Sequence, residues 1–153
     1  MPNSTADISK RLTEFFVAHV PLTQFMELDV DSYDGQQLTL KAPLEPNIND
    51  KQTAFGGSLF NACVMTCWGF AYLKTLEAKL DGNQVVVSGN IKYKRPVTGE
   101  IKATCTTPGE EAEHHFIDGF ERHGKGKIEL KATVMCEGKV AVEFEGTYAI
   151  LKN

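Results

Sequence analysis

The sequence predicts an α+β fold in which an antiparallel sheet packs against one long buried helix. Three observations lead to this class: one long apolar segment has helical spacing, several neighbouring segments alternate as strands do, and no internal repeat or linker interrupts them. Because the strand-like segments follow one another directly, we expect antiparallel pairing, with the helix lying against the sheet. A chain of 153 residues is long enough for a single core, so we expect one domain over residues 1–153.

Composition and charge indicate an ordinary globular protein. The chain is 42% hydrophobic and 24% charged, which is typical of that class. Its net charge of -4 gives no overall basic surface, so we expect no nucleic-acid partner. The first sixteen residues lack the apolar core of a signal peptide, and the four cysteines lie in predicted helix or strands. We therefore expect a cytoplasmic protein with reduced thiols.

The N-terminal part predicts a helix followed by a hairpin. Residues 7–19 carry apolar side chains at spacings of three and four, which indicates an amphipathic helix that ends near Pro21. Residues 26–31 and 37–42 alternate apolar and polar side chains, as strands with one buried face do. Asp34-Gly35 between them is a strong signal for the turn of a β-hairpin.

The central helix is predicted to begin near Gly56 and to be apolar on almost every face. No charged residue occurs between Lys51 and Lys74. Such a helix is either buried inside a domain or spans a membrane. The apolar run is short for a bilayer, which needs about 20 residues, and strand patterns flank it. We therefore predict a buried core helix and no membrane association.

The C-terminal half predicts four strands interrupted by one short helix. The helix is expected to start at a capping box, with Thr107 as the cap and Glu110 three residues later, and to end at Gly124. A Glu137-Gly138 turn separates the last two strands. The strands are expected at residues 84–93, 100–106, 127–136 and 140–151.

The start of the central helix gathers the residues that could carry chemistry. Ser58 and Asn61 are three apart and share a face of the first turns. The free N–H groups of Gly56, Gly57 and Ser58 point out of the same end, where the helix dipole is positive. Converging donors suit an anion or a carbonyl that gains negative charge. The alternative is that the two glycines only turn the chain into the core.

Two segments resemble the hotdog-fold thioesterases: NDKQTAFGGSL at residues 49–59, and NIKYKRPVTGE at residues 90–100. Within that superfamily the chain is similar to the thioesterase family that also occurs as the C-terminal domain of bacterial GNAT-acetyltransferase fusions. The resemblance implies a curved sheet wrapped around the central helix. It also implies a homodimer or dimer of dimers, with acyl-thioester sites between protomers and no cofactor or metal.

The resemblance also assigns residues, and the chain departs from the pattern at two of them. Asn49 matches a loop asparagine that helps to position the thioester or water in related enzymes. Phe55 stands where relatives carry a histidine before the glycine pair. Val64 stands where many relatives carry a carboxylate on the helix. The two departures bear on hydrolysis and not on the fold.

Thioester hydrolysis needs a polarised carbonyl, an activated water and a groove for the acyl chain. Asp50 is the only carboxylate in the motif, so we interpret it as the general base, with Asn49 orienting the reaction. The alternative is that both residues form an Asx-type turn. Six residues are expected to bind substrate, although each polar one could instead be a satisfied buried group: Gly56, Gly57, Ser58, Asn61, Ser88 and Asn90.

The cysteines and the basic residues suggest two other kinds of site. No histidine lies in the motif, and Cys63 and Cys67 have no nearby Cys or His to complete a metal site, so we expect buried thiols and no metal. A basic cluster could meet the phosphates of CoA or of a carrier-protein arm, or could only provide solubility and edge protection. It consists of Lys92, Lys94, Arg95 and Lys102.

Two functions therefore stay open at the level of sequence. One is an acyl-thioester hydrolase acting on acyl-CoA or acyl-carrier protein. The other is a non-catalytic acyl-thioester-binding or dimerisation module.

Overall fold

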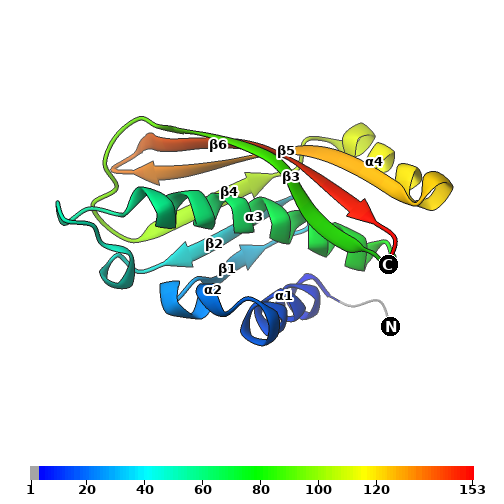
Figure 1. Ribbon diagram of the computed structural model, residues 1–153, viewed down its shortest axis with the longest axis horizontal. Coiled ribbons are helices and arrows are strands. Elements are labelled where there is room, and N and C mark those ends of the chain that lie inside the picture. Colours follow the sequence, from blue (N-terminus) through cyan, green and yellow to red (C-terminus); the bar gives the residue numbers. More distant parts are fainter. Residues whose placement is uncertain (1–3) are drawn as a thin grey trace.

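A six-stranded antiparallel sheet wraps around one long helix in the computed structural model, which describes residues 4–153 (Figure 1). Residues 1–3 of the expected domain lie outside the described residues. The strand order is β1-β2-β4-β5-β6-β3. The strands are β1 Asp29–Tyr33, β2 Gln37–Ala42, β3 Asn83–Tyr93, β4 Ile101–Thr106, β5 Lys125–Cys136 and β6 Lys139–Leu151. The helices are α1 Thr5–His19, α2 Pro21–Met26, the 3₁₀ helix η1 Glu45–Asn47, α3 Gly56–Glu77 and α4 Glu110–His123. The predicted α+β class is confirmed.

Helix α3 fills the inside of the curved sheet, as its apolar sequence predicts. It begins at Gly56 and buries residues such as Leu59, Cys63 and Phe70. The Tyr148 hydroxyl of β6 donates a hydrogen bond of 2.8 Å to the Val64 carbonyl, which fixes the helix against the sheet. Among the helices of residues 4–153, none is long and apolar enough to cross a membrane.

An ion-pair cluster fixes the far end of α3. Lys74 lies 3.2 Å from Glu77 and 3.3 Å from Glu113 of α4. The Tyr33 hydroxyl of β1 donates to Glu77 at 2.9 Å. Burial, and then the charge of Glu77, raise the pKa of Tyr33 well above its usual value, so the phenol stays protonated. The cluster therefore joins the C-terminal end of α3 to β1 and α4.

The predicted strand over residues 26–31 is wrong in its first half. Pro21 does not only end α1; it occupies the first turn of a second helix, α2, which runs to Met26. Proline suits this position because its missing N–H would have no helical partner there. Glu27 then adopts a left-handed conformation with φ of 55°, and β1 begins at Asp29. The side chains of residues 26–31 alternate between apolar and polar as those of a strand do, but this alternation begins before the extended backbone does.

The predicted capping box of α4 is also displaced. Helix α4 starts at Glu110, and its cap is Gly109, whose φ of 120° favours glycine. The Thr107 hydroxyl accepts a hydrogen bond from the Gly109 N–H at 3.1 Å and donates to Glu113. Thr107 therefore closes the turn before the helix rather than capping the helix itself.

The two edge strands differ in how well they are protected. Strand β1 is five residues long, carries Asp29 and Asp31, and has an irregular register between Val30 and Ser32. Strand β3 has eleven residues, and Val87 at its centre is 53% exposed. Short, charged and bulged edges resist further pairing, whereas a long apolar edge invites it. Strand β3 is therefore the edge at which another strand would pair.

Candidate functional site

The loop before α3 is anchored by Asn47, a residue that the sequence analysis did not single out. Its side chain is only 2% exposed, and its amide group donates to the carbonyls of Met26 at 2.9 Å and Pro43 at 2.8 Å. Its backbone carbonyl accepts a hydrogen bond of 2.7 Å from the Phe55 N–H. Asn47 therefore ties the end of α2 and the end of β2 to the start of α3. Nothing in the sequence distinguishes it from Asn49, because one of its two partners, the Met26 carbonyl, lies 21 residues away along the chain.

Asn49 forms a closed turn within the loop. Its Oδ1 accepts hydrogen bonds from the N–H groups of Lys51 at 2.8 Å and Thr53 at 3.1 Å. Its Nδ2 donates to the Thr53 hydroxyl at 2.9 Å and to the Ala54 carbonyl at 3.3 Å. The amide is thus fully used inside the loop, which is the Asx-type arrangement. In this structure Asn49 orders the loop and has no group left for a substrate.

Asp50 lies at the tip of the same loop and points into solvent. Its side chain is 80% exposed and forms an ion pair with Lys51 at 3.1 Å. An exposed pair of this kind contributes little to stability, since solvent screens it and the side chains remain mobile. The carboxylate is therefore free to leave Lys51 for a ligand or a water without a large energetic cost.

The first turn of α3 presents backbone donors. The first intrahelical hydrogen bond runs from the Leu59 N–H to the Phe55 carbonyl at 3.0 Å. The N–H groups of Gly56, Gly57 and Ser58 consequently have no acceptor within residues 4–153. No side chain of the part of the chain that the structure describes caps this helix start. The structure thus brings the two glycines and Ser58 together at one end of α3, as the sequence predicts.

A tyrosine and a phenylalanine flank these donors. The Tyr93 hydroxyl of β3 donates to the Gly56 carbonyl at 2.8 Å, and a Cβ at Gly56 would lie 3.5 Å from the Tyr93 ring. A Cβ at Gly57 would lie only 2.5 Å from the Phe55 ring, so glycine lets this ring fold over the helix start. Phe55 is nevertheless 55% exposed. Phe55 therefore contributes to the exposed apolar surface at the helix start.

The side chain of Asn61 contacts α2 and not the free N–H groups at the start of α3. Its Nδ2 lies 3.0 Å from the sulfur of Met26, the last residue of α2. Ser58 is half-buried one turn earlier on α3 and has no hydrogen-bond partner within the described chain. Of the two, Ser58 is the side chain left available at the helix start.

Ser88 and Asn90 lie on the outer face of the sheet, away from α3, so the structure does not bring these two predicted substrate-binding residues to the helix start. They pair across the strands with Thr147 and Glu145, and directly opposite residues share a face. Both line shallow hollows on that outer face with Lys131. The irregular register between Val86 and Ser88 helps to set which residues of β3 point outward. This register is not visible in the alternation of the sequence.

Apolar side chains surround the helix start on the inner face. The rings of Phe60 on α3 and Phe144 on β6 pack edge to face at 5.8 Å. Gly89 makes this possible, because a Cβ there would lie 2.9 Å from the Phe144 ring. Phe60 remains partly exposed, as do Phe55 and Ile48 in the loop. This end of the molecule therefore combines amide donors with an apolar surface.

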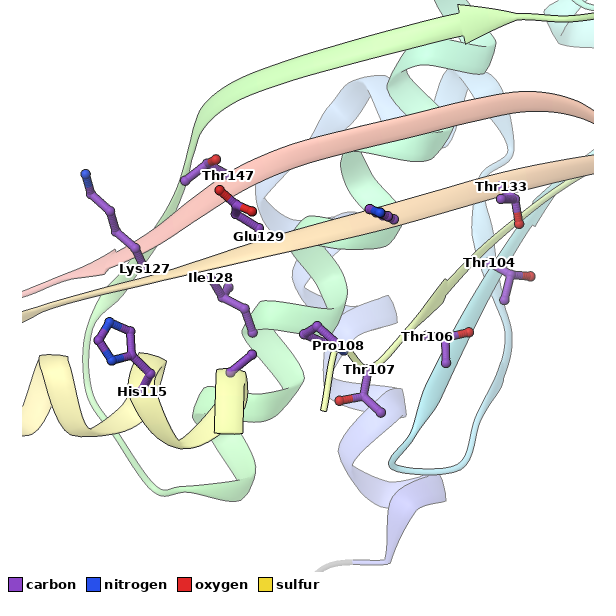
Figure 2. Close-up of a pocket in the computed structure, with 12 residues that line it drawn as sticks. Thr104, Thr106, Thr107, Pro108, His115, Lys127, Ile128, Glu129, Thr133 and Thr147 are labelled. Atoms are coloured by element: carbon purple, nitrogen blue, oxygen red, sulfur yellow. The ribbon is translucent and has the colours of Figure 1, made fainter. Parts of the chain in front are cut away.

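A separate cleft of about 790 Å³ lies between α4 and the outer face of the sheet (Figure 2). Threonine hydroxyls line it together with His115, Lys127 and Glu129. No hydrogen bond or ion pair within residues 4–153 links these three ionisable groups. The cleft thus holds polar side chains but no assembled acid–base pair, and it lies across the sheet from α3.

The cysteines offer no nucleophile. Burial raises the pKa of Cys63 to about 12 and also raises the pKa of Cys67, so both thiols stay protonated at neutral pH. All four cysteines are free. Within the described chain, no group of three or more His, Cys, Asp and Glu side chains could hold a metal ion.

Fold and helix-start geometry together define a hotdog-fold protein of the thioesterase type. The chain belongs to the family described as "Putative thioesterase (yiiD_Cterm)", whose model matches residues 9–152. The resemblance read from the sequence to hotdog thioesterases is therefore confirmed.

Solved structures agree with this assignment. A protein of unknown function from Chlorobaculum tepidum is 53% identical, with 99% of each chain covered and a TM-score of 0.96. A protein described as a putative thioesterase from Shewanella oneidensis is 28% identical over 95% of this chain and 99% of that one, with a TM-score of 0.87. The PaaI protein from the phenylacetic acid degradation operon of E. coli is 13% identical over 98% of each chain, with a TM-score of 0.69, and shares the fold.

Proposed function

We propose that this protein hydrolyses acyl thioesters of CoA or of an acyl-carrier protein, at the N-terminus of α3. The observation that carries the proposal is the set of unpartnered N–H groups of Gly56, Gly57 and Ser58, next to the loop that holds Asp50. Membership of a thioesterase family supports it. The exposed apolar side chains of the loop and of α3 provide a surface for the acyl chain.

In the proposed reaction the thioester carbonyl oxygen faces the amides of Gly56 and Gly57. Asp50 takes a proton from water, the water oxygen bonds to the carbonyl carbon, and the amides stabilise the negative charge on the carbonyl oxygen. The carbon–sulfur bond then breaks, and the leaving sulfur takes the proton from the Asp50 carboxyl group. Asn49 acts through the loop, because its amide fixes the turn that carries Asp50.

The proposal includes a homodimer formed through β3. A second copy that pairs with this edge would satisfy its free backbone groups and cover its exposed valines, Val85 to Val87. Tyr93 of the same strand contacts Gly56, so the partner would approach the start of α3. The site would then lie beside the interface between protomers, in a cytoplasmic protein of one domain per chain.

A second candidate is an acyl-thioester-binding or dimerisation module without catalysis. Phe55 and Val64 favour it, because they stand where relatives are expected to carry a histidine and a carboxylate. Val64 is half-buried on α3, and its carbonyl accepts the hydrogen bond from Tyr148. With valine at position 64, Asp50 is the only carboxylate between Pro46 and Leu76 that could act as a base.

A free-thiol release assay with acyl-CoAs of several chain lengths tests the two candidates. Asp50→Asn is expected to lower kcat by about 10²–10⁴, the usual range for loss of a general base. Asp81→Asn is the matched control, since Asp81 is an exposed carboxylate beyond the other end of α3. Full activity of Asp50→Asn would place the base elsewhere. Wild-type protein that binds acyl-CoA without turnover would favour the binding module.

A further inference from the structure

The connection between β3 and β4 runs beside the start of α3. The Tyr93 hydroxyl contacts the Gly56 carbonyl at 2.8 Å, and the Ala54 N–H donates to the Val97 carbonyl at 2.8 Å. Arg95 lies midway between these two contact points. Two residues of extended chain span at most about 7 Å, so the backbone of Arg95 is held within that distance of both Tyr93 and Val97. The end of β3, the turn between β5 and β6 and the start of α3 all lie at one end of the molecule (Figure 1).

Arg95 keeps most of its hydrogen-bonding capacity. Its Nε donates to the Val140 carbonyl at 3.3 Å, while its two terminal nitrogens have no acceptor within residues 4–153. Two other members of the basic cluster are neutralised: Lys94 pairs with Glu143 at 2.9 Å, and Lys102 lies 3.7 Å from Asp31. The single bond at Nε orients the guanidinium group without satisfying it. Arg95 is thus a positioned cation with free donors.

A cleft of about 380 Å³ adjoins this guanidinium group. It lies between the β3–β4 connection and the β5–β6 turn, and Lys139 adds a second cation that forms no ion pair within the described chain. The Thr98 hydroxyl supplies a further hydrogen-bonding group, and the Cys136 thiol lies 3.5 Å from it. The lining residues are Arg95, Pro96, Thr98, Cys136, Glu137 and Lys139. The cleft therefore carries a net positive charge of one in a protein whose net charge is -4.

We propose that the Arg95–Lys139 cleft binds the phosphate group at the end of the pantetheine arm of the thioester's carrier. The proposal rests on the proposed function, because it places the acyl group at α3. A guanidinium group with two free nitrogens matches two oxygens of one phosphate, and a nearby lysine adds a point charge. The arm between sulfur and phosphate has about the backbone length of four residues, so it reaches roughly 14 Å when extended. That reach suits a thioester at Gly56 and a phosphate beside Arg95.

Titration calorimetry with free CoA tests the cleft without requiring hydrolysis. Arg95→Gln and Lys139→Gln are each expected to weaken CoA binding about tenfold, the usual effect of losing a charge-assisted hydrogen bond. Pantetheine, which lacks phosphate, should bind the variants and wild type alike. Wild-type affinity for CoA should fall as ionic strength rises. Arg122→Gln is the matched control, because Arg122 also uses its Nε, at 2.8 Å from Asp118, but on α4. It should leave CoA binding unchanged.

The same variants titrated with a phosphopantetheine-loaded carrier protein identify the source of the phosphate. An equal loss for the loaded carrier would assign the phosphate attached to the pantetheine arm, which both carriers share, and a loss for CoA alone would assign the CoA diphosphate. Unchanged CoA affinity in Arg95→Gln and Lys139→Gln would overturn the proposal. If wild type hydrolysed acyl-N-acetylcysteamine but did not bind CoA, the cleft would fail and the hydrolase would stand. If CoA bound through Arg95 without any hydrolysis, the cleft would stand and the hydrolase would fail.

Discussion

Replacing Asn47 by alanine or by aspartate is expected to destabilise the protein by different amounts and with different dependence on pH. Alanine leaves the carbonyls of Met26 and Pro43 without their donor. Each unsatisfied buried carbonyl costs about 1–3 kcal/mol. The change also removes the Asn47 Oδ1, which is buried and has no hydrogen-bond partner within residues 4–153, and this offsets about 1–3 kcal/mol. The expected net loss for Asn47→Ala is about 2 kcal/mol.

Aspartate at the same position is expected to be worse than alanine at pH 7. The new carboxylate would face two carbonyl oxygens that cannot donate to it, and a buried unpaired charge costs several kcal/mol. Burial raises the folded-state pKa of such a carboxyl group above its unfolded value of about 3.9. The deficit is therefore complete above the folded-state pKa and shrinks as pH falls through it. Below about pH 3.9 the deficit no longer changes with pH.

Urea denaturation of wild type, Asn47→Ala and Asn47→Asp at pH 7 and at pH 5 measures these differences. The Asn47→Asp variant should be the least stable at pH 7, and its gap to Asn47→Ala should narrow at pH 5. Equal stability of Asn47→Asp and wild type at pH 7 would refute the reasoning, because it would mean that the amide does not donate to the two carbonyls. Because the Asn47 side chain ties the end of α2 and the residue after β2 to the loop before α3, Asn47→Ala should lower thiol release even where it remains folded.

Three further outcomes follow from the structure. Val86→Lys places a charge on the β3 edge and should give a monomer by light scattering, whereas the control Asp31→Lys on the β1 edge should leave the dimer intact. A dimer of the Val86→Lys variant would exclude pairing through β3. Cys136 is only partly buried and should react with a thiol reagent in the native protein, whereas the buried Cys63 and Cys67 should react only after unfolding. Simultaneous labelling of all three thiols would contradict the burial of Cys63 and Cys67. Hydrogen bonds from the N–H groups of Gln36 and Gln37 lower the pKa of Asp34 below 3.8. The contribution of Asp34 to stability is therefore complete above pH 3.8 and is lost as pH falls through the lowered pKa. An NMR titration midpoint of Asp34 at or above 3.8 would contradict these hydrogen bonds.

The sequence by itself determined the elements whose pattern is local and strong. The absence of charge between Lys51 and Lys74, with the glycine pair near the start of that stretch, determined the start and the burial of α3. Alternation located β2, and most of β5 and β6, within two residues. The candidate donors at Gly56 and Gly57 could be predicted for the same reason, since a helix start exposes its first N–H groups in any context.

Only the tertiary structure decided which polar residues surround those donors. Ser88 and Asn90 alternate with apolar neighbours, but their face depends on pairing with Thr147 and Glu145 of β6, which lies more than fifty residues away. Asn47 and Asn49 look equivalent in sequence, yet Asn47 bonds the Met26 carbonyl 21 residues away, whereas Asn49 closes its own loop. The physical reason is that a polar side chain can satisfy its hydrogen bonds locally or across the fold, and the packed partners determine which of the two occurs.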